Sequence, residues 1–362
     1  MIKRSAINFW KMQGEGAWGI QRVLNMIHGY VYYTLYDHYI ACAIFVARTL
    51  SRFPKIIFKT MIIDFFGNRY HCKVITYENA RKLIAVEEDI VLPTEESKKI
   101  IPWEIANKII LKHKDQLAIV DCPCRIEKKT AGKKYCEPIH TCIFYGKVGV
   151  DFVTTHMPRM NGHRATKEEI LSLLELQQKN GKVFTAWFKD ATGYRAGVLC
   201  CCCPCCCACM EVEILSRKKG IKGLAMTAPS GYSVAVGIGR CKICGKCVET
   251  CPYSAMNIVE IDGKKELRYS KDLCMGCGVC IGECPNESLS LVVDPDKGVR
   301  PCCTFEGHLG NLKQESLAGV LSGAAWKTKE AEVEAGTVPE GCKKCLERER
   351  LTGWSVRMNY MR

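Results

Sequence analysis

The run CKICGKCVETCP, residues 241–252, decides the fold of the part of the chain around it. Its cysteines follow the spacing C-x2-C-x2-C-x3-C-P, and the segment CMGCGVCIGECP, residues 274–285, repeats that spacing 33 residues later. A similar apolar segment follows each proline, over residues 254–259 and 288–293, and the residues IDGK at 261–264 predict a hairpin turn between the two halves. The two halves therefore form an internal repeat built around closely spaced thiols.

Structural zinc ribbons also contain cysteines two residues apart, but zinc requires neither a third cysteine at this spacing nor the Cys-Pro step. The repeat resembles two-cluster bacterial ferredoxins over residues 236–293. This resemblance implies two 4Fe-4S clusters that carry single electrons, with the last cysteine of each run reaching the cluster of the other run. The first cluster would then be held by Cys241, Cys244, Cys247 and Cys284, and the second by Cys274, Cys277, Cys280 and Cys251.

The segment LCCCCPCCCACM, residues 199–210, places eight cysteines within ten positions. Adjacent side chains on a regular backbone point in different directions, and a cube takes ligands at four corners, so these thiols cannot all bind one cluster. We expect them to divide between clusters or to include thiols that bind no metal, with Pro204 bending the run. The eight are Cys200, Cys201, Cys202, Cys203, Cys205, Cys206, Cys207 and Cys209.

Four earlier cysteines are further candidate ligands: Cys122, Cys124, Cys136 and Cys142. The first two lie in the segment DCPCR, directly after a predicted buried strand over residues 116–120, and a strand end is a common place for a site. His140 is either a further ligand or a loop histidine with an ordinary hydrogen bond, and we favour the hydrogen bond.

The C-P-C-R segment, the later cysteine pair and the dense run, placed ahead of a two-cluster ferredoxin, resemble a group of ferredoxin-like proteins from anaerobes. The resemblance implies that the upstream cysteines and the run act together around one or two further 4Fe-4S or other iron–sulfur clusters. In this chain more cysteine replaces the polar residue usual inside the run, so which of these thiols bind metal stays open. Zinc or redox-active thiols are the alternatives.

Cys202, Cys206 and Cys209 also fit C-x3-C-x2-C, the signature of radical S-adenosylmethionine enzymes. So dense a run produces that match readily, and the barrel of about 200 residues that normally follows the signature is missing, so we do not predict radical chemistry in this chain. The tail, however, resembles the auxiliary-cluster (SPASM or twitch-like) extension of radical enzymes. That resemblance implies Cys302 or Cys303 as a ligand together with Cys342 and Cys345, or all four, with a zinc knuckle or a reduced thiol pair as the alternative.

The 362 residues include 26 cysteines and carry a formal net charge of +14. So many thiols, without an apolar signal segment after the basic start, predict a reducing cytoplasm and an anaerobic source. Negatively charged clusters offset part of the positive charge, and the remainder predicts a docking surface for an acidic protein or anionic headgroups. Nucleic acid is not expected as a partner because no recognition motif is present, and Gly237-Ile-Gly239 lacks the third glycine of a dinucleotide loop.

Residues 1–115 contain only two cysteines, Cys42 and Cys72, which we interpret as structural. Asp37 and His38 interrupt the apolar segments, so no stretch of about 20 residues could span a bilayer. Basic residues then recur at helical spacing beside apolar ones. Residues 20–66 could therefore contact the cytoplasmic face of a membrane peripherally, but we favour packing against protein.

The remaining patterns predict strands over 73–76 and 183–186 and helices over 77–84, 102–111 and 166–177, the last capped by Thr166. The fold class is therefore α+β. We expect a mostly helical docking region over 1–115, a cysteine-rich α/β domain over 116–230, a two-cluster ferredoxin domain over 231–295 and a small cluster-binding tail over 296–362.

The sequence thus predicts a multi-cluster iron–sulfur protein that carries low-potential electrons as a subunit or partner of an anaerobic oxidoreductase complex. Catalytic residues are not assigned, because no acid–base constellation stands out. One alternative is a reductase whose run, Cys200 to Cys209, holds a cluster with an open iron fed by the ferredoxin clusters. Another is a structural subunit braced by zinc.

Overall fold

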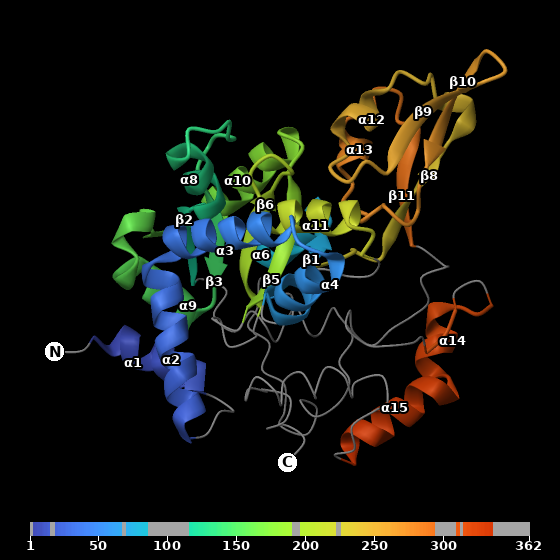
Figure 1. Ribbon diagram of the computed structural model, residues 1–362. Coiled ribbons are helices and arrows are strands. Elements are labelled where there is room, and N and C mark those ends of the chain that lie inside the picture. The colour runs from blue at the N-terminus through green and yellow to red at the C-terminus, as the bar shows by residue number, and fades with distance from the viewer. Residues whose placement is uncertain are drawn as a thin grey trace.

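A computed structural model describes residues 3–14, 19–66, 70–85, 116–189, 196–221, 226–293, 309–311 and 314–335. Among them, seven strands form one sheet in the order β4-β2-β3-β6-β5-β1-β7 (Figure 1). Neighbouring strands are antiparallel except β1 and β7, which are parallel. The strands are β1 (Tyr70–Ile75), β2 (Leu117–Asp121), β3 (His140–Tyr145), β4 (His163–Arg164), β5 (Val183–Lys189), β6 (Ala196–Cys202) and β7 (Thr227–Ala228).

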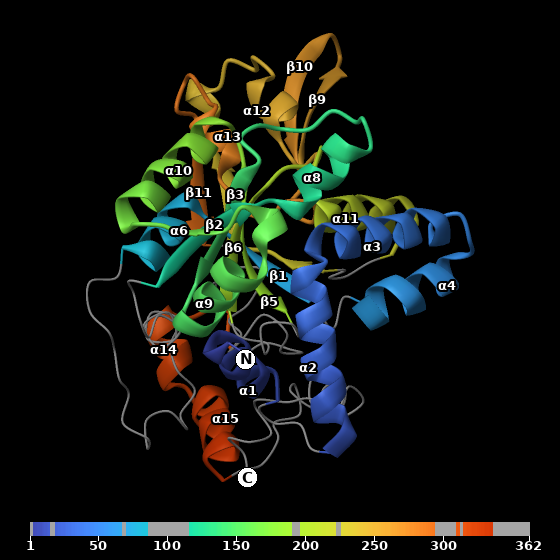
Figure 2. The ribbon, with the colours of Figure 1, turned by 90° about the vertical axis from the view of Figure 1, so that its left-hand side faces the viewer.

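Helices cover both faces of this sheet, and Figure 2 shows the sheet between the two layers. One face packs against α1 (Arg4–Gly14), α2 (Gly19–Thr34), α3 (Tyr36–Leu50), α9 (Lys147–His156) and α11 (Ala208–Lys218). The opposite face packs against α6 (Tyr77–Ile84) and α10 (Lys167–Lys179). The described residues also form helices α4 (Lys55–Phe58), η1 (Lys59–Phe66), α8 (Pro123–Thr130), η3 (Pro158–Met160), η5 (Ile238–Arg240), α14 (Leu317–Ser322) and α15 (Ala324–Glu334).

Strand β6 carries the first cysteines of the dense run, and its pleat separates them. Val198, Cys200 and Cys202 lie in the core with α3 and α11, whereas Leu199 and Cys201 lie in the core with α6 and α10. Successive side chains of a strand point to opposite faces of the sheet, so consecutive thiols cannot share one site.

The ferredoxin repeat forms a lobe that projects from one end of the sheet domain (Figure 1). Two antiparallel pairs of strands build it. One pair is a tight hairpin that turns at Asp262 and Gly263, where the φ angles are 50° and 72°. Both positive angles are those of a type I′ turn, which matches the twist of the strands. The elements are β8 (Tyr232–Val236), α12 (Lys246–Thr250), β9 (Met256–Ile261), β10 (Lys264–Tyr269), α13 (Val279–Gly282) and β11 (Leu289–Val293).

The α+β class is confirmed, and several predicted elements are confirmed with it. The helix over Tyr77–Ile84 has the predicted bounds, and the side chain of Thr166 caps α10 by accepting a hydrogen bond from the backbone amide of Glu169. The predicted helix over residues 102–111 lies outside the described residues. Strand β1 pairs with β5, so the mostly helical region 1–115 contributes a strand to the sheet of residues 116–230.

Helices α3 and α4 illustrate how the basic, apolar segment of residues 20–66 is used. Phe58 and Ile62 are buried against Val212 of α11, whereas Phe53 and Ile56 are exposed. Arg48 forms an ion pair with Glu211, at 2.6 Å between Nε and Oε1. The segment therefore packs one face on the protein, and none of the described helices is long and apolar enough to cross a membrane.

Candidate metal centres

The eight cysteines of the ferredoxin repeat line two small cavities in the lobe, each of about 20 Å³. The members of each set come from both cysteine runs, as the ferredoxin resemblance implies. The first cavity is lined by Cys241, Cys244, Cys247 and Cys284, and the second by Cys251, Cys274, Cys277 and Cys280.

Backbone amides already point at some of these sulfurs. The amide of Ala255 donates to Sγ of Cys251 at 3.2 Å, and that of Gly276 donates to Sγ of Cys274 at 3.4 Å. Such N–H donors stabilise thiolates and tune the potential of a cluster held by them. Both amides serve the second cavity, and the four converging thiols of each cavity fit a cubane cluster.

Gly276 lets the second run approach the rest of the lobe. Its φ is +63°, and a Cβ atom built on it would lie 2.3 Å from both Ser230 Oγ and Tyr232 O. Only glycine tolerates both that angle and that contact. The glycine directly before Cys277 is thus required by backbone packing.

A second group of thiols meets at one end of the seven-stranded sheet. In an antiparallel sheet the carboxyl end of one strand lies beside the amino end of the next, so β2, β3 and β6 bring their cysteines to the same end. Cys142 pairs with Cys200 across β3 and β6, with their Sγ atoms 3.9 Å apart. Cys122 and Cys207 are the residues that precede helices α8 and α11.

Six of these thiols form a closed ring, in which each sulfur interacts with the next. The thiol ring runs Cys122, Cys124, Cys207, Cys202, Cys200, Cys142 and back to Cys122. Hydrogen bonding with Cys124, and then with Cys142, lowers the pKa of Cys122 well below its usual value. Hydrogen bonding with Cys124, and then with Cys202, does the same for Cys207. Neighbouring thiols thus favour the thiolate form at these two positions, and thiolates are the form that binds metal.

The thiol ring borders a cavity of about 100 Å³, against about 20 Å³ for each ferredoxin cavity. Its other walls are largely apolar and aromatic, with Tyr32, Tyr36 and Trp187 among them. Six thiols beside a cavity of this size fit an iron–sulfur centre. Both the number of thiols and the volume are larger than a cube held by four thiolates requires.

Arg125 supplies a buried positive charge beside the thiol ring. The residue is 1% exposed, and its Nη2 donates to the carbonyl oxygen of Cys201 at 3.0 Å and to Gln177 Oε1 at 3.3 Å. Burial opposes the charge of Arg125, but the nearby thiols Cys122, Cys203, Cys142 and Cys201 raise its pKa. A buried cation compensates thiolate charge, so the arginine of the C-P-C-R segment belongs to the site.

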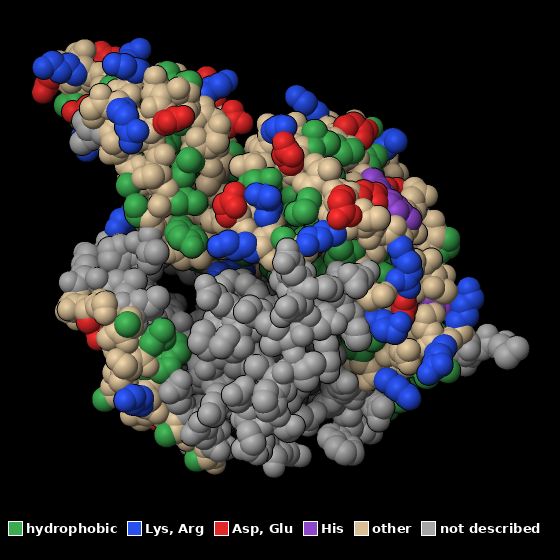
Figure 3. All heavy atoms as spheres, turned by 180° about the vertical axis from the view of Figure 1, so that it is seen from behind, with side chains coloured by type: hydrophobic (Ala, Val, Ile, Leu, Met, Phe, Trp, Pro, Cys, Tyr) green, Lys and Arg blue, Asp and Glu red, His purple; other side chains and the backbone are tan. Residues whose placement is uncertain are grey.

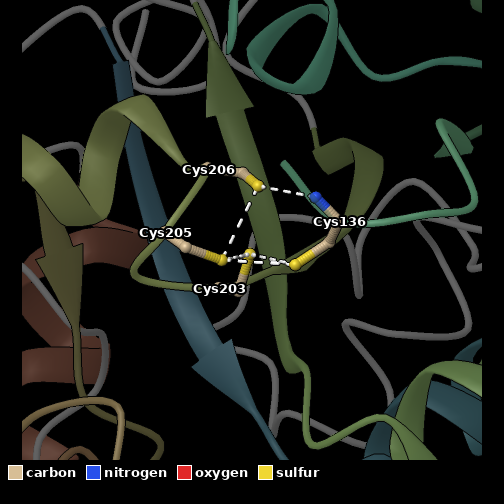
Figure 4. Close-up of side chains that lie close together, drawn as sticks. All are labelled: Cys136, Cys203, Cys205 and Cys206. Carbon is tan, nitrogen blue, oxygen red and sulfur yellow. Dashed lines mark hydrogen bonds between the residues drawn. The ribbon is translucent and has the colours of Figure 1, made fainter. Parts of the chain in front are cut away.

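Four other cysteines form a separate compact group, the thiol quartet of Cys136, Cys203, Cys205 and Cys206 (Figure 4). All four Sγ atoms lie within 4.8 Å of one another. Cys136 comes from the loop between α8 and β3, and the other three come from the turn after β6. Cys203 and Cys206 also border the cavity of the thiol ring, so the thiol quartet lies at its edge.

Two cysteines of the dense run belong to neither group. Cys201 lies on the opposite face of the sheet, in the core with α6 and α10. Cys209 contacts Cys72, with their Sγ atoms 4.0 Å apart, and also contacts Thr227. The triplet Cys202, Cys206 and Cys209 of the radical-type signature is thus split among three places.

The structure also reveals residues that the sequence did not single out. The sequence suggests only a structural role for Cys72, yet it lies against Cys209 because its side chain points from β1 to the sheet face that α11 covers. Lys182 places Nζ 3.2 Å from Sγ of Cys136. Neither residue stands within a cysteine motif, and only strand pairing brings them to the site.

His140 opens β3 and makes hydrogen bonds with both ring nitrogens. Nδ1 lies 2.7 Å from Asp121 Oδ1, and Nε2 lies 3.0 Å from Nδ1 of His163, which in turn reaches Glu169. Both nitrogens are engaged with other side chains, as in the hydrogen-bonded alternative.

The tail residues Cys302, Cys303, Cys342 and Cys345 lie outside the described residues.

Tyr253 connects the ferredoxin lobe to the thiol ring. It lines the second ferredoxin cavity and lies in the same core as Cys200, Cys202 and Cys207. Burial raises the pKa of Tyr253 well above its usual value, and thiols on both sides, Cys277 in the lobe and Cys202 in the sheet domain, raise it further. Arg217 of α11 lies 5.8 Å from the centre of its ring and 3.8 Å from Sδ of Met275.

Comparison with known proteins supports the assignment of the C-terminal half. Residues 236–291 match the family model of a 4Fe-4S dicluster domain, and residues 284–346 match that of an iron-sulfur cluster-binding domain. The chain is also similar to the [Co(II) methylated amine-specific corrinoid protein] reductase of Methanosarcina barkeri, with 37% identity over 57 residues. That match covers 16% of this chain and 11% of the relative, and no solved structure matches the chain.

The motif spacing, the two cysteine-lined cavities and the family models agree on 4Fe-4S clusters as cofactors. The chain carries a 4Fe-4S dicluster domain followed by a second iron–sulfur cluster-binding domain, and its role is in iron–sulfur redox chemistry.

Proposed function

We propose that this chain transfers low-potential electrons from an external redox protein, through its ferredoxin lobe, to an iron–sulfur centre held by the thiol ring. It acts as a subunit or partner of a larger anaerobic oxidoreductase. The observation that carries the proposal is the position of Tyr253, which borders the second ferredoxin cavity and shares a core with the thiol ring.

When bound, the clusters supply one-electron acceptance and release at low potential. The protein determines the order in which the clusters pass electrons and the residues that surround each cluster. Cys244 of the first cavity is exposed, whereas all four cysteines of the second are buried or partly buried, so the first cavity is the one that faces an external partner. Between the second cavity and the thiol ring lie Tyr253 and Met275, both buried, which exclude water from the space between them.

An acidic redox protein is the partner that fits the outer end of the lobe. Lys242 and Lys246 line the first cavity, and Arg240 precedes it. In Figure 3 lysine and arginine side chains lie on the projecting lobe, with acidic side chains among them. Electrostatic docking at this end predicts an association rate that falls as salt is added.

A reducing, anaerobic cytoplasm suits a chain with this many thiols. There the exposed side chains of Phe53, Ile56 and Met61 could also contact the cytoplasmic face of a membrane, which is the less favoured of the two interpretations of residues 20–66. The reductase of Methanosarcina barkeri is named for reducing a corrinoid protein, which supports a redox role for the shared segment.

A second candidate function is a reductase in which the thiol ring leaves an iron open to a small substrate. The cavity favours it, because about 100 Å³ with apolar, aromatic walls offers more space than either ferredoxin cavity. The two candidates differ in whether a small molecule binds at the thiol ring, while electron delivery through the lobe is common to both.

The test compares the unmodified chain with Cys277→Ser, after anaerobic purification and iron counting. Each protein is mixed with a limiting amount of a reduced low-potential ferredoxin and frozen at set times for electron paramagnetic resonance. We expect the unmodified chain to show reduction of the thiol-ring centre after that of the lobe. In Cys277→Ser the thiol-ring centre should keep its iron but become reduced much more slowly.

Equal rates of reduction in the two proteins would contradict electron delivery through the lobe. Cys42→Ser is the matched control, because Cys42 is exposed on α3 and outside both sites. For the second candidate, cyanide is added to the reduced chain. A change in the thiol-ring signal alone would favour an open iron, and no change would favour electron transfer without substrate binding.

A further inference from the structure

The thiol quartet joins two separate pieces of chain at the edge of the large cavity. Cys203, Cys205 and Cys206 occupy the turn around Pro204, where the amides of Cys206 and Cys207 both donate to the carbonyl oxygen of Cys203. Cys136 reaches this turn from the loop between α8 and β3 (Figure 4). A ligand bound by all four thiols would therefore fasten that loop to the turn.

The spacing of the sulfurs decides what size of ligand they fit. Sγ of Cys205 lies 3.0 Å from that of Cys203, 3.2 Å from that of Cys136 and 3.7 Å from that of Cys206. A tetrahedral ion with metal–sulfur bonds of about 2.3 Å separates its sulfurs by about 3.8 Å. The four thiolates of a cube bind four different irons at its corners, so their sulfurs lie farther apart.

The cysteine sets of the ferredoxin lobe provide a comparison for the spacing of the sulfurs in the thiol quartet. In the described part of the chain, the thiol quartet is the one group of metal-ligating side chains whose donor atoms all lie within 4.8 Å of one another. The two cysteine sets of the ferredoxin lobe are also fully described and enclose cavities instead. The same chain thus holds open sets that fit clusters and one compact set that fits a single ion.

Nitrogen donors surround two of the four sulfurs of the thiol quartet. Lys182 donates from Nζ to Sγ of Cys136 at 3.2 Å, and the backbone amide of Cys136 donates to Sγ of Cys206 at 3.3 Å. Such outer partners orient and stabilise thiolates around a metal ion.

We infer that Cys136, Cys203, Cys205 and Cys206 bind one divalent metal ion, Zn²⁺ or Fe²⁺, in a tetrahedral site separate from every iron–sulfur cluster of this chain. The ion clamps the loop before β3 to the turn after β6 and so closes one edge of the cavity of the thiol ring. This inference is independent of the proposed electron transfer, because it requires no electron to pass.

The experiment measures iron, zinc and acid-labile sulfide per chain in the anaerobically purified full-length protein. Cys205→Ser and Cys136→Ser alter the site from its two separate pieces of chain, and Cys42→Ser is the control. We expect each of the first two variants to lose about one metal ion per chain while the sulfide content stays at that of the unmodified chain. X-ray absorption at the edge of the lost metal should show four sulfurs at about 2.3 Å in the unmodified chain.

Loss of either zinc or iron from the variants would support the site, and the metal that is lost identifies the ion. Loss of about four irons together with about four sulfides in both variants would overturn the inference, because it would place a cube at the thiol quartet. Full metal content in both variants would overturn it as well. The spectra of the ferredoxin lobe, unchanged in the variants, report that the chain has folded.

Discussion

The ferredoxin lobe and the thiol ring both gather cysteines, but they do so by different means. In the lobe each set of four comes from two short runs with fixed spacing, and each set encloses a cavity of about 20 Å³. In the sheet domain six thiols from β3, β6 and two helix starts surround a cavity of about 100 Å³. Local spacing thus specifies a cluster of standard size, whereas strand pairing can build a larger and less regular site.

The two regions also differ in how charge is balanced. Backbone amides donate to cysteine sulfurs in the lobe, as at Cys251 and Cys274. Near the thiol ring a buried side chain, Arg125, provides a full positive charge. The sheet-domain site therefore depends on particular side chains, and the lobe depends more on its backbone.

The largest expected effect comes from removing a member of the thiol ring. Cys207→Ser should abolish the centre held there, with a loss of at least about four irons per chain, because Cys207 borders the cavity and joins Cys124 to Cys202 in the ring. Iron analysis and electron paramagnetic resonance of the reduced protein would measure this, with the lobe signals unchanged. An unaltered iron content would show that the thiol ring holds no iron–sulfur centre.

The next effect tests the dependence on a buried charge. Arg125→Met should destabilise the sheet domain by about 3–5 kcal/mol, because it leaves the carbonyl oxygen of Cys201 and Gln177 Oε1 without their donor beside the thiolates. The melting temperature under anaerobic conditions reports it. Arg164→Met is the control, since Arg164 forms an exposed ion pair with Asp151 and should cost less than about 1 kcal/mol. Equal shifts in the two variants would contradict a special role for Arg125.

A third prediction tests the dependence of the lobe on its backbone. Gly276→Ala should destabilise the lobe by about 2–4 kcal/mol, because it adds a steric clash with Tyr232 O to the cost of a positive φ. Gly263→Ala has a similar φ of 72° but nothing within 4 Å of the new Cβ, so it should cost only about 1 kcal/mol. Thermal melting of the lobe clusters separates the two, and equal losses would show that the contact with residue 232 does not matter.

The smallest expected effect lies where the two regions meet. The hydroxyl of Tyr253 is buried without a hydrogen-bond partner among the described residues, so Tyr253→Phe should leave stability unchanged or raise it by about 1 kcal/mol. Tyr253→Ala should instead open the contact between the lobe and the thiol ring and slow electron delivery. Melting temperatures and the freeze-quench measurement described above test both. A large loss of stability in Tyr253→Phe would indicate that the hydroxyl has a partner in the metal-loaded protein.

Much of the local structure could be predicted from the sequence because it depends on neighbours in the chain. The hairpin at Asp262 and Gly263, the cap at Thr166 and the helix Tyr77–Ile84 all follow from residues within a few positions. The thiol ring could not be predicted in this way. Its members are separated by up to 85 positions, from Cys122 to Cys207, and only the order β2-β3-β6 brings them together.

The sequence by itself determined that this protein binds 4Fe-4S clusters, because the C-x2-C-x2-C-x3-C-P spacing matches the reach of a loop around a cube. It also determined that the eight cysteines of the dense run cannot all belong to one site. Only the tertiary structure decided how they divide: the pleat of β6 turns Cys201 away from Cys200 and Cys202, and the turn at Pro204 carries the next thiols to Cys136. Side-chain direction in a strand alternates with every residue, but which face meets which partner depends on the pairing of distant strands.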